Sequence, residues 1–237
     1  MTVVQNIADK DGGGRTAIEE VYSSLRQKIL MAELAPESRL RVEELRQQYG
    51  VGSSTVREAL SHLLVDNLVT AKEQRGFHVA AVSQEDFRQI SDVRILLETQ
   101  AVRDSVTNGD DEWENRVVAA AHQLAKVEAK MPELRREEDY VVAWEARNND
   151  FHNALVSACT NDWLLRFRAQ VFAHSFRYRR LSVKERNVPR DVRAEHQALF
   201  EAAIARDVER AVEVTIEHIR KSVTVLEAHM AELGKTG

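Results

Sequence analysis

The chain has 237 residues, of which 43% are hydrophobic and 30% charged, which is the composition of a globular protein with a buried core. No apolar run approaches the roughly 20 residues of a membrane span, and the single cysteine excludes an intramolecular disulfide, so we expect a cytoplasmic protein with no membrane partner. The net charge of −5 does not favour nucleic acid in general, and residues 15–80 carry nine Lys/Arg and nine Asp/Glu, so DNA binding would depend on where individual cations lie.

The N-terminal third predicts a flexible tail and three helices. Residues 1–14 end in a glycine run and are predicted to form the tail. The segment "TAIEEVYSSLRQKILMAEL" has apolar residues at helical spacing and stops at "APES". A short helix follows over "VEELRQQYG", closed by Gly50 as a left-handed cap. A third helix is predicted over "SSTVREALSHLLVDN", capped by a hydroxyl among Ser53, Ser54 and Thr55.

The periodicity changes after the third helix. The segments "LVTA" and "FHVAAV" predict two short strands around the turn "KEQRG". Three helices and a hairpin describe a winged helix-turn-helix domain over residues 15–82. In that motif the second helix of the pair enters the major groove, and its first residues face the bases. The residues predicted to contact DNA are Ser53, Ser54, Thr55, Arg57, Arg75 and Gly76.

The chemistry of these residues allows two interpretations. Hydroxyls reach phosphates or base edges with little bulk, and Arg57 could fork onto a guanine or hold a phosphate. Arg75, at the wing tip before Gly76, could reach the adjacent backbone or minor groove. Alternatively, the hydroxyls only cap the helix and Arg57 pairs with Glu58 or another acid.

The segment "YGVGSSTVREALSHLLVDNLVTAKEQRGFHVA" resembles the DNA-binding domain of the GntR family of bacterial transcription regulators. The shared features are Gly50, the Val-Arg-Glu-Ala-Leu core at residues 56–60 and the Arg-Gly-Phe wing at residues 75–77. The resemblance implies a double-stranded DNA operator as partner. Ser53 stands where relatives often carry an arginine, so we expect modest affinity and an unusual half-site.

From Ser83 onward the pattern is entirely helical. Six helices are predicted, at about residues 84–108, 111–130, 137–159, 162–182, 191–205 and 208–232. Short loops join them, which indicates one antiparallel bundle over residues 83–233. The predicted fold class is therefore mainly α, with an N-terminal winged helix-turn-helix and an all-α antiparallel six-helix bundle.

Three histidines of the bundle have a spacing that suits a joint site. Asn148 and His152 stand at i and i+4, on one helix face. His196 and His218 each lie eleven residues from Asp207, at the break between two helices. If these helices fold back on each other, both histidines stand at the same level, about 16 Å from the turn. Three imidazoles and an oxygen donor would suit zinc or nickel. Alternatively, each histidine is a half-buried structural residue.

The bundle also resembles a known domain. The segments "DVRILLETQAVRDS", "NNDFHNALVSACTND" and "EHQALFEAAIARDVERAVEVTIEHI" resemble the FCD ligand-binding domain of the FadR-type branch of GntR regulators. Six bundle helices are similar to its VanR-like subgroup. The resemblance implies an effector site at Arg94, whose alternative role is an ion pair with Glu98, and a divalent metal. The implied metal ligands are Asn148, His152, His196 and His218.

These features predict a homodimeric, metabolite-responsive repressor. Binding of a small organic acid beside the metal would release the repressor from a pseudo-palindromic operator. The rival hypothesis is a metal-dependent all-helical hydrolase in which His152, His196 and His218 activate water. It lacks an evident general base: no His-Glu-x-x-His stretch occurs, and Asp150 and Glu195 adjoin ligands without forming a recognised motif. A third hypothesis is a regulator whose bundle only dimerises and binds neither ligand nor metal.

Overall fold

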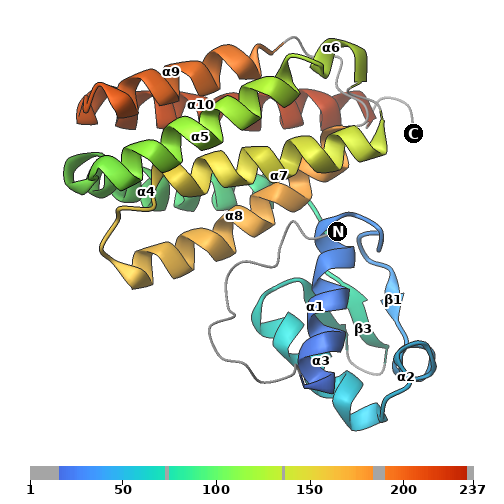
Figure 1. Cartoon of the computed structure of the whole chain (residues 1–237). Helices are drawn as coiled ribbons and strands as arrows, with labels where there is room; N and C mark the ends of the chain where they lie inside the picture. Colours follow the sequence, from blue (N-terminus) through green and yellow to red (C-terminus); the bar gives the residue numbers. More distant parts are fainter. Residues whose placement is uncertain (1–15, 73–74, 135–136, 184–189, 234–237) are drawn as a thin grey trace. The chain divides into compact units, whose positions relative to one another are not determined.

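The computed structural model describes residues 16–72, 75–134, 137–183 and 190–233 (Figure 1). The flexible tail predicted for residues 1–14 lies outside this part of the chain. The described residues form two compact units: one contains those up to residue 83 together with residues 176–181, and the other contains the rest. No helix of the described residues is long and apolar enough to cross a membrane.

The first unit contains the predicted winged helix-turn-helix. Its helices are α1 (Ala17–Leu30), α2 (Val42–Tyr49) and α3 (Ser53–Val65), and its wing contains β2 (Val69–Lys72) and β3 (Gly76–Val79). A third strand, β1 (Arg39–Leu40), pairs antiparallel with β3 and gives the sheet order β1-β3-β2. The sequence-based prediction missed β1, because two residues are too few for a detectable alternation of polar and apolar side chains.

Local sequence explains how the helices of this unit begin and end. Thr16 and Glu19 form a capping box at the start of α1, in which each side chain accepts the backbone N–H of the other residue. Gly50 ends α2 with a φ of 66°, the predicted left-handed cap. The predicted hydroxyl cap of α3 is wrong: Gly52 is the N-cap and Ser53 is the first helical residue. Glycine is itself acceptable as an N-cap, so the helix starts one residue before a hydroxyl could cap it.

The apolar stripes of α1 and α3 form the core of this unit. Val21 and Leu25 of α1 are 1% exposed, and Val56, Leu60 and Leu63 of α3 are fully buried. Burial of each such side chain contributes about 1.5–3 kcal/mol. This packing fixes which face of α3 remains exposed.

The second unit is a helical bundle. Its long helices are α4 (Gln84–Asn108), α5 (Asp111–Glu128), α7 (Glu138–Leu155), α8 (Asp162–Val183), α9 (Val192–Ile204) and α10 (Val208–Leu233). They match the six predicted helices, and a single turn, α6 (Met131–Leu134), falls in the predicted break between the second and third of them. Helix α5 lies beside α7 and α9, and α10 lies beside α4 and α9 (Figure 1).

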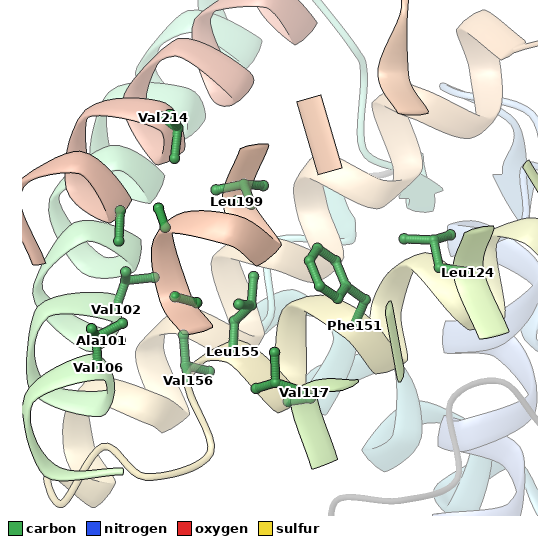
Figure 2. Close-up of a cluster of buried hydrophobic side chains, with 14 of the residues drawn as sticks. Ala101, Val102, Val106, Val117, Leu124, Phe151, Leu155, Val156, Leu199 and Val214 are labelled. Carbon is green, nitrogen blue, oxygen red and sulfur yellow. The ribbon is translucent and has the colours of Figure 1, made fainter. Parts of the chain in front are cut away.

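The bundle core joins side chains from helices that are distant in sequence. Figure 2 shows Phe151 and Leu155 of α7 together with Leu199 of α9 and Val102 of α4. Phe151 is fully buried, and Val102, Leu155 and Leu199 are 3–4% exposed. Because this apolar layer holds α4, α7 and α9 against one another, polar side chains on the same helices are held at defined positions.

Candidate metal centre and DNA-reading surface

The start of α3 presents the hydroxyls and the arginine that were predicted to contact DNA. Ser53, Ser54 and Arg57 are exposed, and Thr55 is half-buried. The Arg57 guanidinium has no ion pair or hydrogen bond within the described part of the chain, so the alternative pairing with Glu58 is not observed. Arg57 is therefore open to an external anion.

Other arginines near α3 are already paired with acids. Arg41 contacts Glu44 at 2.6 Å, and Arg46 contacts Glu43 at 2.6 Å. Such exposed pairs add little stability, but they neutralise the cations of α2. Because the domain carries equal numbers of cations and acids, this pairing leaves few cations for a polyanion, and Arg57 is one of them.

The wing supplies further cations. Arg75 and Gly76 are exposed at its tip, and Gly76 has a φ of 79°, which favours glycine. Arg39 on β1 stands directly opposite His78 on β3, which in turn faces Thr70 on β2. Residues directly opposite one another point to the same face of a sheet. Arg39 therefore joins a polar face of the wing, and sequence reasoning missed it because it missed β1.

In the second unit, three histidines from three helices meet in the interior. His152 comes from α7, His196 from α9 and His218 from α10. Their ring centroids are 5.0–5.4 Å apart, and one ring nitrogen from each lies within 4.8 Å of the other two. All three are buried, with 4–7% of their surface exposed. This is the spacing at which three imidazoles can share one metal ion.

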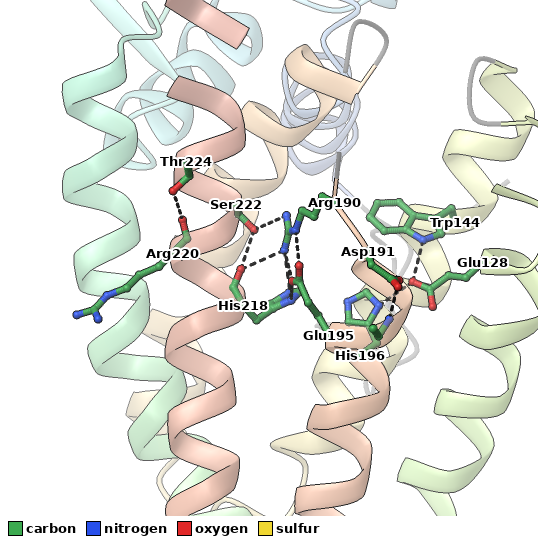
Figure 3. A network of polar contacts seen from close by, with 11 residues as sticks. Glu128, Trp144, Arg190, Asp191, Glu195, His196, His218, Arg220, Ser222 and Thr224 are labelled. Carbon is green, nitrogen blue, oxygen red and sulfur yellow. Dashed lines mark hydrogen bonds and ion pairs between the residues drawn. The ribbon is translucent and has the colours of Figure 1, made fainter. Parts of the chain in front are cut away.

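The ring nitrogens fit a metal site. Nε2 of His152 and Nε2 of His196 are buried and have no hydrogen-bond partner in the described chain. On the opposite side of two rings, a carboxylate accepts from Nδ1: Glu128 at 2.7 Å from His196 and Glu195 at 2.8 Å from His218 (Figure 3). A proton held on Nδ1 leaves the Nε2 lone pair for a metal. Buried polar atoms without partners are costly, which favours a bound cation here.

The environment of His152 also keeps it neutral. Burial is the largest effect lowering its pKa well below the ordinary value, followed by the repulsion of His218, His196, Arg94 and Arg168. A metal ligand must be the neutral imidazole, so this environment prepares the ring for coordination.

Asn148, the fourth predicted ligand, lies on α7 one turn before His152. It is buried, with 3% of its surface exposed. Its amide could contribute a neutral oxygen from the same helix face.

A small cavity adjoins the cluster and contains the predicted effector residue. Arg94, Glu98, Thr215, His152 and His218 line it together with apolar side chains, and its free volume of about 10 Å³ is room for one water molecule. Arg94 makes the ion pair considered as the alternative role, with its Nε 3.3 Å from Glu98. Arg94 therefore both lines the cavity and pairs with Glu98.

Glu98 is held by a second arginine that sequence reasoning missed. Nε of Arg168 donates to Glu98 at 2.8 Å, and its other nitrogens bond the side chain of Asn153 and the carbonyl of His152. Burial raises the pKa of Glu98, but Arg168 and Arg94 outweigh it and hold that pKa below its usual range. Both guanidiniums therefore contact the Glu98 carboxylate beside the cavity.

The chain matches two family models. The model described as bacterial regulatory proteins of the gntR family matches residues 17–79, and the FCD domain model matches residues 89–221. The chain belongs to the GntR family. It is 43% identical to the HTH-type transcriptional regulator BphR of Paraburkholderia xenovorans (strain LB400), over 90% of this chain and 86% of that protein. It is 34% identical to the HTH-type transcriptional repressor GlaR of Escherichia coli (strain K12), over 89% of this chain and 96% of that protein.

Solved structures agree with this assignment at the level of the fold. Escherichia coli McbR/YncC superposes with a TM-score of 0.71 at 20% identity, over 90% of this chain and 98% of that one. This GntR-family protein is a DNA-binding transcription regulator with an FCD domain, not an enzyme. The hydrolase hypothesis is therefore not supported.

Proposed function

We propose that this GntR-family protein is a repressor that leaves its operator when a small carboxylate binds beside a divalent metal in the FCD domain. The convergence of His152, His196 and His218, with two unpartnered Nε2 atoms, carries the proposal. Operator binding implies that the protein works in the cytoplasm.

Zinc or nickel suits the site best. Three neutral imidazoles are the donors that these ions prefer, and Asn148 would add an oxygen. When bound, the ion would supply a positive centre for an anionic effector. The chain itself contributes the buried ligands, the fixed Nδ1–H groups and the apolar walls that exclude water.

Metal analysis of the purified protein tests the site. We expect about one zinc or nickel ion per chain and its loss in the His196→Ala variant. The exposed His122, on α5, provides the control, because His122→Ala should retain the metal. Unchanged metal content and unchanged thermal stability in His196→Ala would favour a bundle that only dimerises.

Arg94 would hold the effector. A guanidinium binds a carboxylate through two parallel hydrogen bonds, and Arg94 lines the cavity that His152 and His218 also line. Because the cavity has room for about one water, the effector must displace side chains, and Arg94 would exchange Glu98 for the ligand. This exchange would alter α4, which carries both residues.

A thermal-shift screen of small organic acids tests this role. We expect one acid to stabilise the wild type and to bind Arg94→Gln at least tenfold more weakly. The control is Arg103→Gln on the same helix, whose guanidinium pairs with Glu209 at the surface. Equal responses of the two variants would contradict the role of Arg94.

A homodimer would place two reading heads on a pseudo-palindrome. In support, large apolar side chains remain exposed on two bundle helices: Leu96 on α4 is 70% exposed, and Trp163 and Phe167 on α8 are 66% and 52% exposed. Exposed apolar side chains of this size are common at protein interfaces. Light scattering should give twice the mass of the chain, and a monomeric mass would contradict the dimer.

Arg57, Arg75 and the hydroxyls of Ser53, Ser54 and Thr55 would contact the operator, with Gly76 allowing the wing to turn at its tip. We expect Arg57→Ala to weaken operator binding by about 1–3 kcal/mol and Arg41→Ala to change it little, because Glu44 already neutralises Arg41. Operator binding should weaken as the salt concentration rises, and the effector acid should release the protein from the operator. Binding without sequence preference would contradict a specific operator.

A further inference from the structure

Glu128 is a buried carboxylate with an unusual set of partners. Its Oε1 accepts from Nδ1 of His196 at 2.7 Å and from the indole N–H of Trp144 at 3.3 Å (Figure 3). The Glu128 side chain is 2% exposed. No Lys or Arg contacts it within the described residues. Burying a carboxylate without a cation costs free energy, so the hydrogen bond from Nδ1 of His196 is needed to stabilise the charge of Glu128.

Glu195 contacts the neighbouring ligand in the same way but is already neutralised. It accepts from Nδ1 of His218 at 2.8 Å, and Arg190 donates to both of its oxygens at 2.6 and 2.9 Å. Arg190 also approaches Nδ1 of His218 at 3.4 Å and bonds Ser222. The guanidinium therefore competes with the imidazole for the negative charge of Glu195.

We propose that Glu128 is the main positioning residue of the metal centre and that Glu195 contributes less because Arg190 neutralises it. Glu128 holds His196 as the Nδ1–H form, directs its Nε2 lone pair toward the other histidines and makes the ring a stronger donor. It also supplies the only uncompensated negative charge that contacts a cluster histidine in the described chain. The inference rests on the proposed metal site and adds a ranking of the ligands: His196 is anchored most firmly.

The test compares zinc affinities, measured by competition with a chromophoric chelator. Glu128→Gln keeps the shape and an acceptor oxygen but removes the charge, and we expect zinc to bind about 10–100-fold more weakly. Glu195→Gln should weaken binding by less. Tyr140→Phe is the matched control, because the Tyr140 hydroxyl bonds the carbonyl of the adjacent Val127 and contacts no histidine. We expect its zinc affinity to equal that of the wild type.

A second readout needs no zinc. Long-range ¹H–¹⁵N NMR of the metal-free wild type should show His196 as the Nδ1–H form, and Tyr140→Phe should keep that form. Glu128→Ala should abolish this preference, whereas an unchanged tautomer in Glu128→Ala would mean that Glu128 is only structural. His196 found as the Nε2–H form in the wild type would overturn the proposal even if Glu128 variants failed to fold.

The outcomes separate the two proposals. The inference is overturned, and the metal site is kept, if the wild type binds zinc and Glu128→Gln binds it equally well. The same conclusion follows if Glu195→Gln binds zinc more weakly than Glu128→Gln does. A wild type that takes up no divalent metal overturns the metal site, and the inference falls with it.

Discussion

The buried Arg168–Glu98 ion pair should contribute measurably to the free energy of unfolding of the bundle. The two side chains are 4% and 3% exposed and 2.8 Å apart, so solvent screens them little. Arg168→Met removes the cation and leaves Glu98 with Arg94 at 3.3 Å. Because Arg168 also donates to Asn153 and to the carbonyl of His152, its removal leaves buried acceptors without a donor, and we expect a total loss of about 3–5 kcal/mol. For a protein of this size that lowers Tm by roughly 6–20 °C.

Urea unfolding followed by tryptophan fluorescence measures this loss. All three tryptophans, Trp113, Trp144 and Trp163, lie in the bundle, so the signal reports its free energy of unfolding. The matched control is Arg210→Met, whose pair with Glu213 is 49% and 60% exposed, and we expect no measurable loss there. A loss from Arg168→Met no larger than that of the control would refute the reasoning.

The pH dependence of the stabilisation by this pair follows from the direction in which the pKa of Glu98 is shifted. The pKa of Glu98 is lower in the folded chain than its usual value, against the effect of its own burial, because Arg168 and Arg94 oppose protonation. Its contribution is therefore fully present above the unfolded pKa and is lost as pH falls through the folded one. The difference between wild type and Arg168→Met should shrink in acid. A difference that stays constant down to the acid limit of folding would contradict the ion-pair explanation.

Further predictions concern the bundle and the DNA-binding unit. Gly109→Ala should lower the free energy of unfolding by about 1–3 kcal/mol, because the added Cβ would lie 2.5 Å from the Trp113 ring; an unchanged melting curve would contradict this. Asp104 accepts the backbone N–H of Thr160, the largest cause of its lowered pKa, with the opposing effect of burial next. Its stability contribution is lost as pH falls, so Asp104→Asn should flatten the acid limb of a stability profile, and parallel profiles would refute it. Arg57→Ala should reduce the salt slope of operator binding by about one, and an unchanged slope would show that Arg57 touches no phosphate.

Much of the fold could be predicted because the signals are local. Apolar residues at helical spacing marked the long helices, and Gly50 marked the end of α2 through its left-handed backbone. The break around Asp207 separates α9 from α10, so His196 and His218 lie at one level as expected. Strand β1 and the N-cap of α3 were missed, because one depends on pairing with a distant strand and the other on where the chain turns into the helix.

The sequence alone determined the helical periodicities, the winged domain and the positions of the three histidines. Only the tertiary structure decided which acids contact them. Glu195 is the sequence neighbour of His196 but bonds His218, because consecutive residues of a helix point in different directions. Glu128, sixty-eight positions from His196, accepts the Nδ1 proton of that ring. Side-chain partners across a bundle depend on how whole helices pack, and that packing is a property of every contact at once.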